Sequence, residues 1–262
     1  MAGELTILKL GGSVLTKKDR PLTVNLAAMR RLAREIKNAG TRSLLIIHGG
    51  GSFGHPLAKR YRIMEGLKDE SQIIGFSRVH RAMMELNAAV VDALLEEGLP
   101  ALPVSPSSFA STEGGELRSL ETDLLTKYLR MGLLPVLYGD VVLDSKKGFS
   151  ILSGDQLVSK LAIELRSRLI VIGVDVDGLF SSDPKEDAGA KLFRRISLKN
   201  LDRVKLKPSK NIDVTGGMPF KVKELSKVVE KGRQVLLVNA LTPRRIYKAL
   251  LGEEVIGTVI DP

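Results

Sequence analysis

Short apolar runs alternate along the chain with longer stretches in which apolar residues recur at helical spacing. The short runs predict buried strands over residues 6–10, 43–47, 101–104, 134–138, 169–174, 235–238 and 258–260. The longer stretches predict helices over residues 25–38, 72–97, 121–130, 155–166, 214–231 and 243–250. Residues 141–152 show the alternation of a β-hairpin, with the turn at residues 144–148.

This alternation of strands and helices predicts an α/β fold, a sandwich built on a largely parallel sheet. We expect residues 1–165 to form one lobe and residues 166–262 the other, with one continuous sheet running through both. Ligands of such folds bind at the carboxyl ends of the strands. Glycine clusters fall at several of these ends, at residues 11–12, residues 49–51 and Gly139, so we expect a binding site there.

The composition is that of a globular protein with a substantial core, since 44% of the 262 residues are hydrophobic and 27% are charged. Cysteine is absent, which excludes disulfides and thiolate metal sites and fits a reducing compartment. The first ten residues lack the regions of a signal peptide, and no uncharged apolar run approaches the ~20 residues of a membrane span. We therefore expect a cytoplasmic protein with no membrane partner.

The net charge of +10 is compatible with nucleic acid, an anionic membrane or anionic small substrates. Part of the excess is local, because residues 185–210 contain nine basic and three acidic residues. A solvated basic face or flap is the simplest interpretation of that segment. Aromatic residues make up only 4% and form no stacking platform, so we expect no nucleic acid partner.

Two glycine clusters that follow predicted strands suit phosphate binding. Lys9 ends the first strand and Gly-Gly-Ser follows at residues 11–13, so backbone N–H groups can approach phosphate oxygens beside an ammonium group. This spacing matches neither a Walker A loop nor a dinucleotide fingerprint, and alone it is more often a tight turn. The second cluster has four glycines in six positions after His48, more than a plain loop needs. His48 suits a structural role, whereas we expect His55 in the following loop, where it can donate to a phosphate.

Three further clusters each have a structural and a functional interpretation. Asp155 opens a predicted helix, where it caps the helix or positions lysines. Asp175 and Asp177 follow a predicted strand and form either a polar turn or contacts to a nucleotide and its metal. Residues 213–218 precede Lys221 at the start of a predicted helix, which suits phosphate. Each cluster alone is a weak signal, but all of them in one chain favour a phosphate-transfer site.

Together these clusters resemble the amino acid kinase superfamily over essentially the whole chain. Residues 13–18, 48–56 and 213–218 are most similar to the branch that phosphorylates isopentenyl phosphate, and a histidine at position 55 is typical of phosphate or phosphonate acceptors. The resemblance implies a three-layer αβα sandwich in which the first lobe binds the acceptor and the second binds ATP. It also implies a homodimer that uses ATP and Mg²⁺ to phosphorylate a prenyl monophosphate, a small-molecule substrate of isoprenoid biosynthesis.

The resemblance further implies a role for each candidate residue. The ATP-binding set is Lys9, Gly11, Gly12, Ser13, Gly51, Asp175, Gly216, Gly217 and Lys221, and the substrate-binding set is Gly50, His55 and Gly154. The catalytic set is Lys9, Lys18, Lys221, Asp155 and His55. In this set Lys9 and Lys221 flank the transferred phosphoryl group, Asp155 orients them, and either Lys18 or its neighbour Lys17 reaches the γ-phosphoryl. We expect no protein ligand to a metal.

Two alternatives stay open. A kinase of the same fold could act on a phosphonate of the fosfomycin type or on another small acceptor, although His55 argues against carboxylates. A nucleotide-sensing or nucleic-acid-binding protein could use the positive charge, but the complete catalytic set argues against it. The stripe of Phe76, Val79, Met83 and Leu86 is mostly core, and one or two of its members would line a pocket for a prenyl tail.

Overall fold

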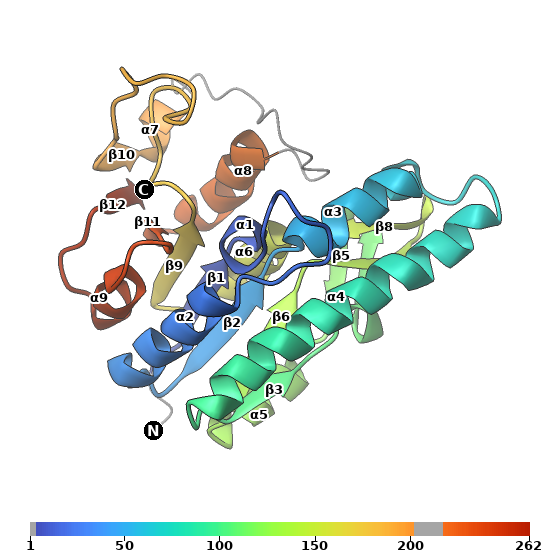
Figure 1. Cartoon of the computed structure of the whole chain (residues 1–262), viewed down its shortest axis with the longest axis horizontal. Helices are drawn as coiled ribbons and strands as arrows, with labels where there is room; N and C mark the ends of the chain where they lie inside the picture. Colours follow the sequence, from blue (N-terminus) through green and yellow to red (C-terminus); the bar gives the residue numbers. More distant parts are fainter. Residues whose placement is uncertain (1–3, 202–216) are drawn as a thin grey trace.

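The computed structural model describes residues 4–201 and 217–262. Its centre is an eight-stranded sheet in the order β10-β12-β11-β9-β1-β2-β6-β3 (Figure 1). Its strands are β1 (Thr6–Leu10), β2 (Leu44–His48), β3 (Ala101–Pro103), β6 (Leu134–Tyr138), β9 (Leu169–Val174), β10 (Arg195–Ser197), β11 (Val235–Asn239) and β12 (Gly257–Asp261). Neighbouring strands are parallel except β11 and β12. The prediction of a largely parallel sheet is confirmed, and β10 is the strand that it lacked.

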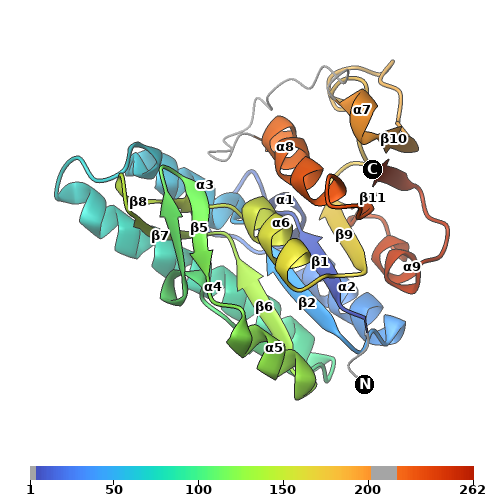
Figure 2. The same cartoon turned by 180° about the vertical axis from the view of Figure 1, so that it is seen from behind.

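Helices cover both faces of this sheet (Figures 1 and 2). They are α1 (Gly12–Leu15), α2 (Leu26–Ala39), α3 (Gly51–Arg60), α4 (Ser71–Glu96), α5 (Asp123–Arg130), α6 (Gly154–Glu164), α7 (Leu198–Leu201), α8 (Gly217–Val229) and α9 (Arg245–Leu251), with 3₁₀ turns η1 (Ile63–Glu65) and η2 (Pro106–Ser108). Side chains of α2, α4 and α9 pack on one face, and those of α5, α6 and α8 on the other. Strand β1 serves both cores, because Leu8 faces the first and Ile7 the second. The predicted three-layer αβα sandwich is confirmed.

Helix α2 has a capping residue at each end. Asn25 accepts the N–H of Ala28 at 3.3 Å at the start of α2, and Gly40 ends that helix with φ of 62°. The helix predicted from residue 243 begins instead at Arg245, because Arg244 has φ of 66° and is not helical. The predicted start of the helix over residues 214–231 lies outside the described residues.

A second, four-stranded sheet has the order β5-β4-β7-β8 (Figure 2). Its strands are β4 (Ala110–Glu113), β5 (Glu116–Leu120), β7 (Asp140–Asp144) and β8 (Gly148–Leu152). The predicted hairpin is confirmed as β7 and β8, whereas β4 and β5 were not predicted. Asp144 links the turn between β4 and β5 to the turn between β7 and β8. Its carboxylate accepts backbone N–H groups of residues 114, 115, 146 and 147 at 2.7–3.0 Å.

The carboxyl ends of β9, β1, β2 and β6 are neighbours at one edge of the large sheet. Backbone hydrogen bonds link the first residue after each of three strands to the strand beside it. The N–H of Gly11 donates to the Gly173 carbonyl at 2.8 Å, and that of Gly49 to the Leu10 carbonyl at 3.0 Å. Gly139 donates in the same way to His48 at 3.0 Å. The glycine clusters are therefore held together at this edge.

Candidate active site

A cleft of about 670 Å³ opens at this edge, within the size range of small-molecule sites. Of the predicted site residues, Lys9, Gly11, Gly12, Ser13, Lys18, Gly50, Gly51, His55, Gly154, Asp155, Asp175, Gly217 and Lys221 line it. Gly216 lies outside the described residues. Segments from both ends of the chain thus meet around one cavity.

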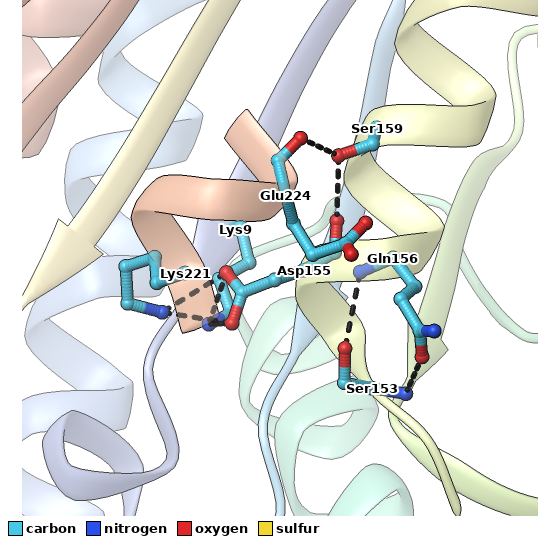
Figure 3. A network of polar contacts seen from close by, with 7 residues as sticks. All are labelled: Lys9, Ser153, Asp155, Gln156, Ser159, Lys221 and Glu224. Carbon is cyan, nitrogen blue, oxygen red and sulfur yellow. Dashed lines mark hydrogen bonds and ion pairs between the residues drawn. The ribbon is translucent and has the colours of Figure 1, made fainter. Parts of the chain in front are cut away.

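The polar centre of the cleft is a carboxylate held between two lysines (Figure 3). Asp155 accepts hydrogen bonds from Nζ of Lys9 at 3.0 and 3.1 Å, and from Nζ of Lys221 at 2.9 Å to both oxygens. These side chains are only 5%, 7% and 12% exposed for Lys9, Asp155 and Lys221. Two ammonium groups around one carboxylate leave a net charge of +1, which suits an anion in the cleft.

Burial and charge together set the ionisation of this cluster. Burial raises the pKa of Asp155, but the charges of Lys221 and Lys9 outweigh burial and lower that pKa to about 2. Burial also lowers the pKa of Lys9 to about 8. The negative charge of Asp155 raises this pKa, but the like charge of Lys221 partly cancels that effect. At neutral pH the carboxylate is ionised and Lys9 is mostly protonated.

The first turn of α6 is fixed by a capping box. The Ser153 hydroxyl accepts the N–H of Gln156 at 3.1 Å, and Oε1 of Gln156 accepts the N–H of Ser153 at 3.0 Å (Figure 3). Ser159 on the next turn donates to the carbonyl of Glu224 at 2.6 Å, which ties α6 to α8, the helix that carries Lys221. At the start of α6, Ser153 and Gln156 therefore cap the helix, and Asp155 between them positions the two lysines.

The backbones of the two glycine clusters, at residues 11–12 and 49–51, are in close contact. A Cβ on Gly12 would lie 2.1 Å from the backbone nitrogen of Gly51, and one on Gly51 would lie 2.2 Å from Oγ1 of Thr16. Oγ1 of Thr16 donates to the Gly12 carbonyl at 2.9 Å and accepts the N–H of Ser52 at 3.0 Å. Glycine is required at both positions because the backbones could not otherwise approach so closely.

The prediction that His55 lies in a loop is wrong, because residues 51–60 form helix α3. Pro56 inside this helix has no N–H, so the Ser52 carbonyl lacks its helical donor and accepts instead the N–H of Leu22 at 3.3 Å. Glycines and a proline are poor helix formers, and they concealed the helix in the sequence. The side chain of His55 still lines the cleft, as expected.

His48 takes the structural role that the sequence suggested. Its ring is fully buried and stacks on Tyr138 with centroids 5.6 Å apart. Nδ1 lies 3.2 Å from the carbonyl oxygen of Gly49. Burial lowers the pKa of His48 to about 4, so the ring is neutral at physiological pH.

A second cluster of lysines meets a carboxylate on the wall of the cleft. Nζ of Lys18 lies 2.8 Å from Oδ2 of Asp175, and Nζ of Lys185 lies 2.5 Å from the same oxygen. Burial raises the pKa of Asp175, but its contacts with Lys18 and Lys185 prevail and lower it to about 2. It is Lys18, not the neighbouring Lys17, that lines the cleft.

Apolar side chains also line the cleft. Three of them, Val79 and Met83 of α4 and Ile151 of β8, belong to the same hydrophobic cluster and form an apolar part of its wall. The other two members of the predicted stripe lie elsewhere, since Phe76 packs beside another aromatic ring and Leu86 is fully buried in the core. The expectation that one or two residues of this stripe would border a pocket agrees with this geometry.

Sequence reasoning missed two parts of the wall. Residues 179–180 and 182–185 line the cleft, and among them Lys185 belongs to the segment for which the sequence predicts a solvated basic face. Asp140 also lines it and accepts a hydrogen bond from Nδ1 of His80 at 2.9 Å. Burial raises the pKa of Asp140, and the bond to Asp140 raises that of His80. The position of Asp140 directly after Gly139, beyond a strand, was the available signal.

In residues 4–201 and 217–262, no group of three or more His, Cys, Asp or Glu residues is placed to hold a metal ion. In the same part of the chain, none of the helices combines the length and the apolar character needed to cross a membrane.

The family model described as "Amino acid kinase family" matches residues 4–239. The chain belongs to the amino acid kinase family. Within this family it is 43% identical to isopentenyl phosphate kinase of Methanothermobacter thermautotrophicus over 264 residues, which cover 98% of each chain. It is 39% identical to isopentenyl phosphate kinase of Methanocaldococcus jannaschii over 269 residues, again 98% of each. An X-ray structure of isopentenyl phosphate kinase superposes with a TM-score of 0.87 at 40% identity, over 98% of this chain and 99% of the other.

Proposed function

We propose that this amino acid kinase transfers the γ-phosphoryl group of ATP to isopentenyl phosphate and forms isopentenyl diphosphate. The observation that carries the proposal is a single cleft that joins a cationic centre at Asp155 to an apolar wall at Val79, Met83 and Ile151. A prenyl monophosphate has the same two parts, a dianion and an apolar tail. The names of the relatives at 43% and 39% identity support this acceptor.

Phosphoryl transfer needs in-line positioning and charge neutralisation more than covalent help. An oxygen of the acceptor phosphate attacks the γ-phosphorus, the bond from this phosphorus to the β–γ bridging oxygen breaks, and ADP leaves. Lys9 and Lys221 offset the charge on the transferred group, and Asp155 holds both ammonium groups in position through its hydrogen bonds. No general base is needed, because the attacking oxygen is already ionised.

The acceptor phosphate binds at Gly50, His55 and Gly154, and the prenyl tail lies against the apolar wall formed by Val79, Met83 and Ile151. This assigns acceptor binding to the lobe of residues 1–165. It assigns ATP binding to residues 166–262, together with residues 11–18 and Gly51 of the first lobe. A compact phosphonate of the fosfomycin type would leave the apolar wall without a partner. The prenyl monophosphate is therefore the better fit.

ATP phosphates bind at Gly11, Gly12, Ser13, Gly51 and Gly217, with Lys18 close to the γ-phosphoryl. The carboxylates of Asp155 and Asp175 are already bonded to lysines. Mg²⁺ commonly keeps substrate phosphates and water as ligands. We therefore infer that the phosphate oxygens of ATP, rather than these carboxylates, would hold Mg²⁺, and that the bound ion would supply charge neutralisation. A role for Gly216, a homodimer and a cytoplasmic location stay predictions.

A panel of acceptors tests the proposal. ADP formation is measured with isopentenyl phosphate, fosfomycin, aspartate, glutamate and acetylglutamate at equal concentrations. We expect kcat/KM for isopentenyl phosphate to exceed the others by about 10²-fold or more, since a site built for a dianion beside an apolar wall is left with unpaired groups by the wrong acceptor. Efficient phosphorylation of an amino acid, or a preference for fosfomycin, would contradict the assignment.

A further inference from the structure

Two separate parts of the chain supply the apolar part of the cleft wall. Helix α4 contributes Val79 and Met83. The hairpin of β7 and β8 contributes Val141 and Ile151, which are paired across the two strands. All four side chains pack in one hydrophobic cluster. Because apolar contacts are non-directional, they do not by themselves fix how α4 is placed against the hairpin.

A polar contact joins α4 to the hairpin directly beside these residues. Nδ1 of His80 lies 2.9 Å from Oδ2 and 3.1 Å from Oδ1 of Asp140. His80 follows Val79 on α4, and Asp140 is the residue before Val141 on β7. Each partner is therefore the chain neighbour of a wall residue. Oδ1 of Asp140 also accepts the N–H of Val141 at 2.8 Å, which holds the carboxylate in one orientation.

A purely structural link between the helix and the hairpin does not account for this pair. The Asp140 side chain is fully buried, so its ionised form is costly. Apolar residues of similar volume often replace a buried ion pair without loss of stability. Phe76 and Phe149 already make such an apolar link one turn earlier on α4, with ring centroids 5.6 Å apart. A hydrogen bond differs in being directional, so it selects one placement of the helix among those that apolar packing permits.

We propose that His80 and Asp140 are a positioning pair that fixes the spacing between α4 and the hairpin and thereby sets the length of the apolar tail that the cleft accepts. This rests on the proposed function, because it needs an acceptor with a prenyl tail. Asp140 lines the cleft, where its charge alone would repel an acceptor phosphate, and a protonated His80 offsets that charge. His80 itself does not line the cleft, so it acts indirectly.

The test compares two acceptors that share a phosphate and differ in the tail. The full chain without ATP is titrated with isopentenyl phosphate and with geranyl phosphate, whose tail is twice as long. The tail ratio is the Kd for geranyl phosphate divided by the Kd for isopentenyl phosphate. A change of charge at Asp140 affects both phosphates alike and cancels in this ratio, whereas a change in the spacing of the wall does not.

His80→Ala removes the hydrogen bond, so the tail ratio should fall about tenfold, while KM for ATP changes less than about twofold. His80→Leu fills the same space without a donor and should show the same fall, which keeps the test open if His80→Ala does not fold. His80→Asn places an amide nitrogen where Nδ1 lies in histidine, so it should restore most of the ratio.

The matched control is Asn87→Ala. Asn87 is a buried residue two turns later on α4, and it donates to the Val136 carbonyl at 3.1 Å, away from the cleft. This variant also loses a polar contact between α4 and a strand, so its Tm should fall. Its tail ratio should stay that of the unmodified chain, because the wall residues keep their spacing.

An unchanged tail ratio in His80→Ala and His80→Leu, with both Kd values raised together, would overturn the proposal, because the pair would then act by charge alone. The same fall of the ratio in Asn87→Ala would also overturn it, since any loss of stability would then open the wall. If the unmodified chain binds both acceptors but forms no ADP with them, the proposed function falls and the positioning pair is still tested by binding. If it binds neither acceptor, or both equally, the positioning pair falls.

Discussion

The substitution Asp155→Asn removes the negative charge from the polar centre of the cleft and leaves its shape almost unchanged. The carboxylate makes four contacts of 2.9–3.1 Å with the two lysines. An amide offers one oxygen to the two ammonium groups and turns its NH₂ group toward them. Lys9 and Lys221 then remain buried beside each other without a counter-charge.

The magnitude follows from burial. Removing one partner of a buried ion pair costs about 3–5 kcal/mol, and two ammonium groups lose their partner here, so we expect the upper part of that range. Displaced lysines no longer stabilise the transferred phosphoryl group, and kcat should fall about 10²- to 10³-fold. Urea unfolding gives the free energy of unfolding, and steady-state ADP formation gives kcat.

Asp144→Asn is the matched control. Asp144 is also a buried carboxylate, but its partners are the backbone N–H groups of two turns outside the cleft. This variant should lose stability and keep kcat within about twofold, because nothing at the reacting atoms changes. A kcat near that of the unmodified chain in Asp155→Asn, or the same fall in kcat in Asp144→Asn, would refute the reasoning.

Acid unfolding adds a second readout for the same variant. The pKa of Asp155 is lowered from 3.8 to about 2 in the folded chain. A lowered carboxylate pKa stabilises the folded state above pH 3.8, and this contribution is lost as the pH falls through about 2. Asp155→Asn should therefore show a smaller loss of stability between these pH values than the unmodified chain.

Three further predictions concern the rest of the site. His55→Ala should raise KM for the acceptor about ten- to a hundredfold and leave KM for ATP nearly unchanged, with partial recovery in His55→Gln; equal increases for both substrates would count against an acceptor role. Because the pKa of Lys9 is lowered to about 8, kcat/KM should fall as the pH rises through about 8, and Lys9→Arg should move this fall to higher pH. If kcat/KM of Lys9→Arg still falls near pH 8, a group other than Lys9 is responsible for the pH dependence. Gly12→Ala should lower the free energy of unfolding by more than about 2 kcal/mol, since its Cβ would lie 2.1 Å from a backbone nitrogen. Gly189→Ala is the control and should cost less than about 1 kcal/mol, because its Cβ meets only a carboxylate oxygen at 3.2 Å. Similar costs for both variants would contradict the close packing of the glycine loops.

The central sheet was predictable because its strands are buried on both faces. Such strands appear as continuous apolar runs, and β1, β2 and β6 are buried along their whole length. The two strands that were not predicted, β4 (Ala110–Glu113) and β5 (Glu116–Leu120), lacked this signal, since β4 has two buried residues and β5 has none. Helix α3 was hidden by its glycines and Pro56, whose cost is offset by tertiary contacts such as the hydrogen bond from Leu22 to Ser52.

The candidate site was predictable where its residues lie within a few positions of a strand end. Lys9 and Asp175 are at such ends, and the parallel sheet brings those ends together. Lys185 was not predictable, because it reaches Asp175 only through the fold of a loop that continues past the strand. The charge of the segment from residue 185 to 210 suggested a solvated face. Only the geometry separates Lys185 from the described basic residues 191, 194, 195 and 199 of that segment, which do not line the cleft.

The most direct test of the central claim is a ³¹P NMR spectrum of the purified chain mixed with ATP, Mg²⁺ and isopentenyl phosphate. The proposed reaction predicts that the monophosphate resonance of the acceptor disappears, while the two coupled resonances of a new diphosphate and those of ADP grow in equal amounts. ADP that appears with inorganic phosphate alone, with the acceptor resonance unchanged, would contradict the claim that this cleft joins the two phosphates.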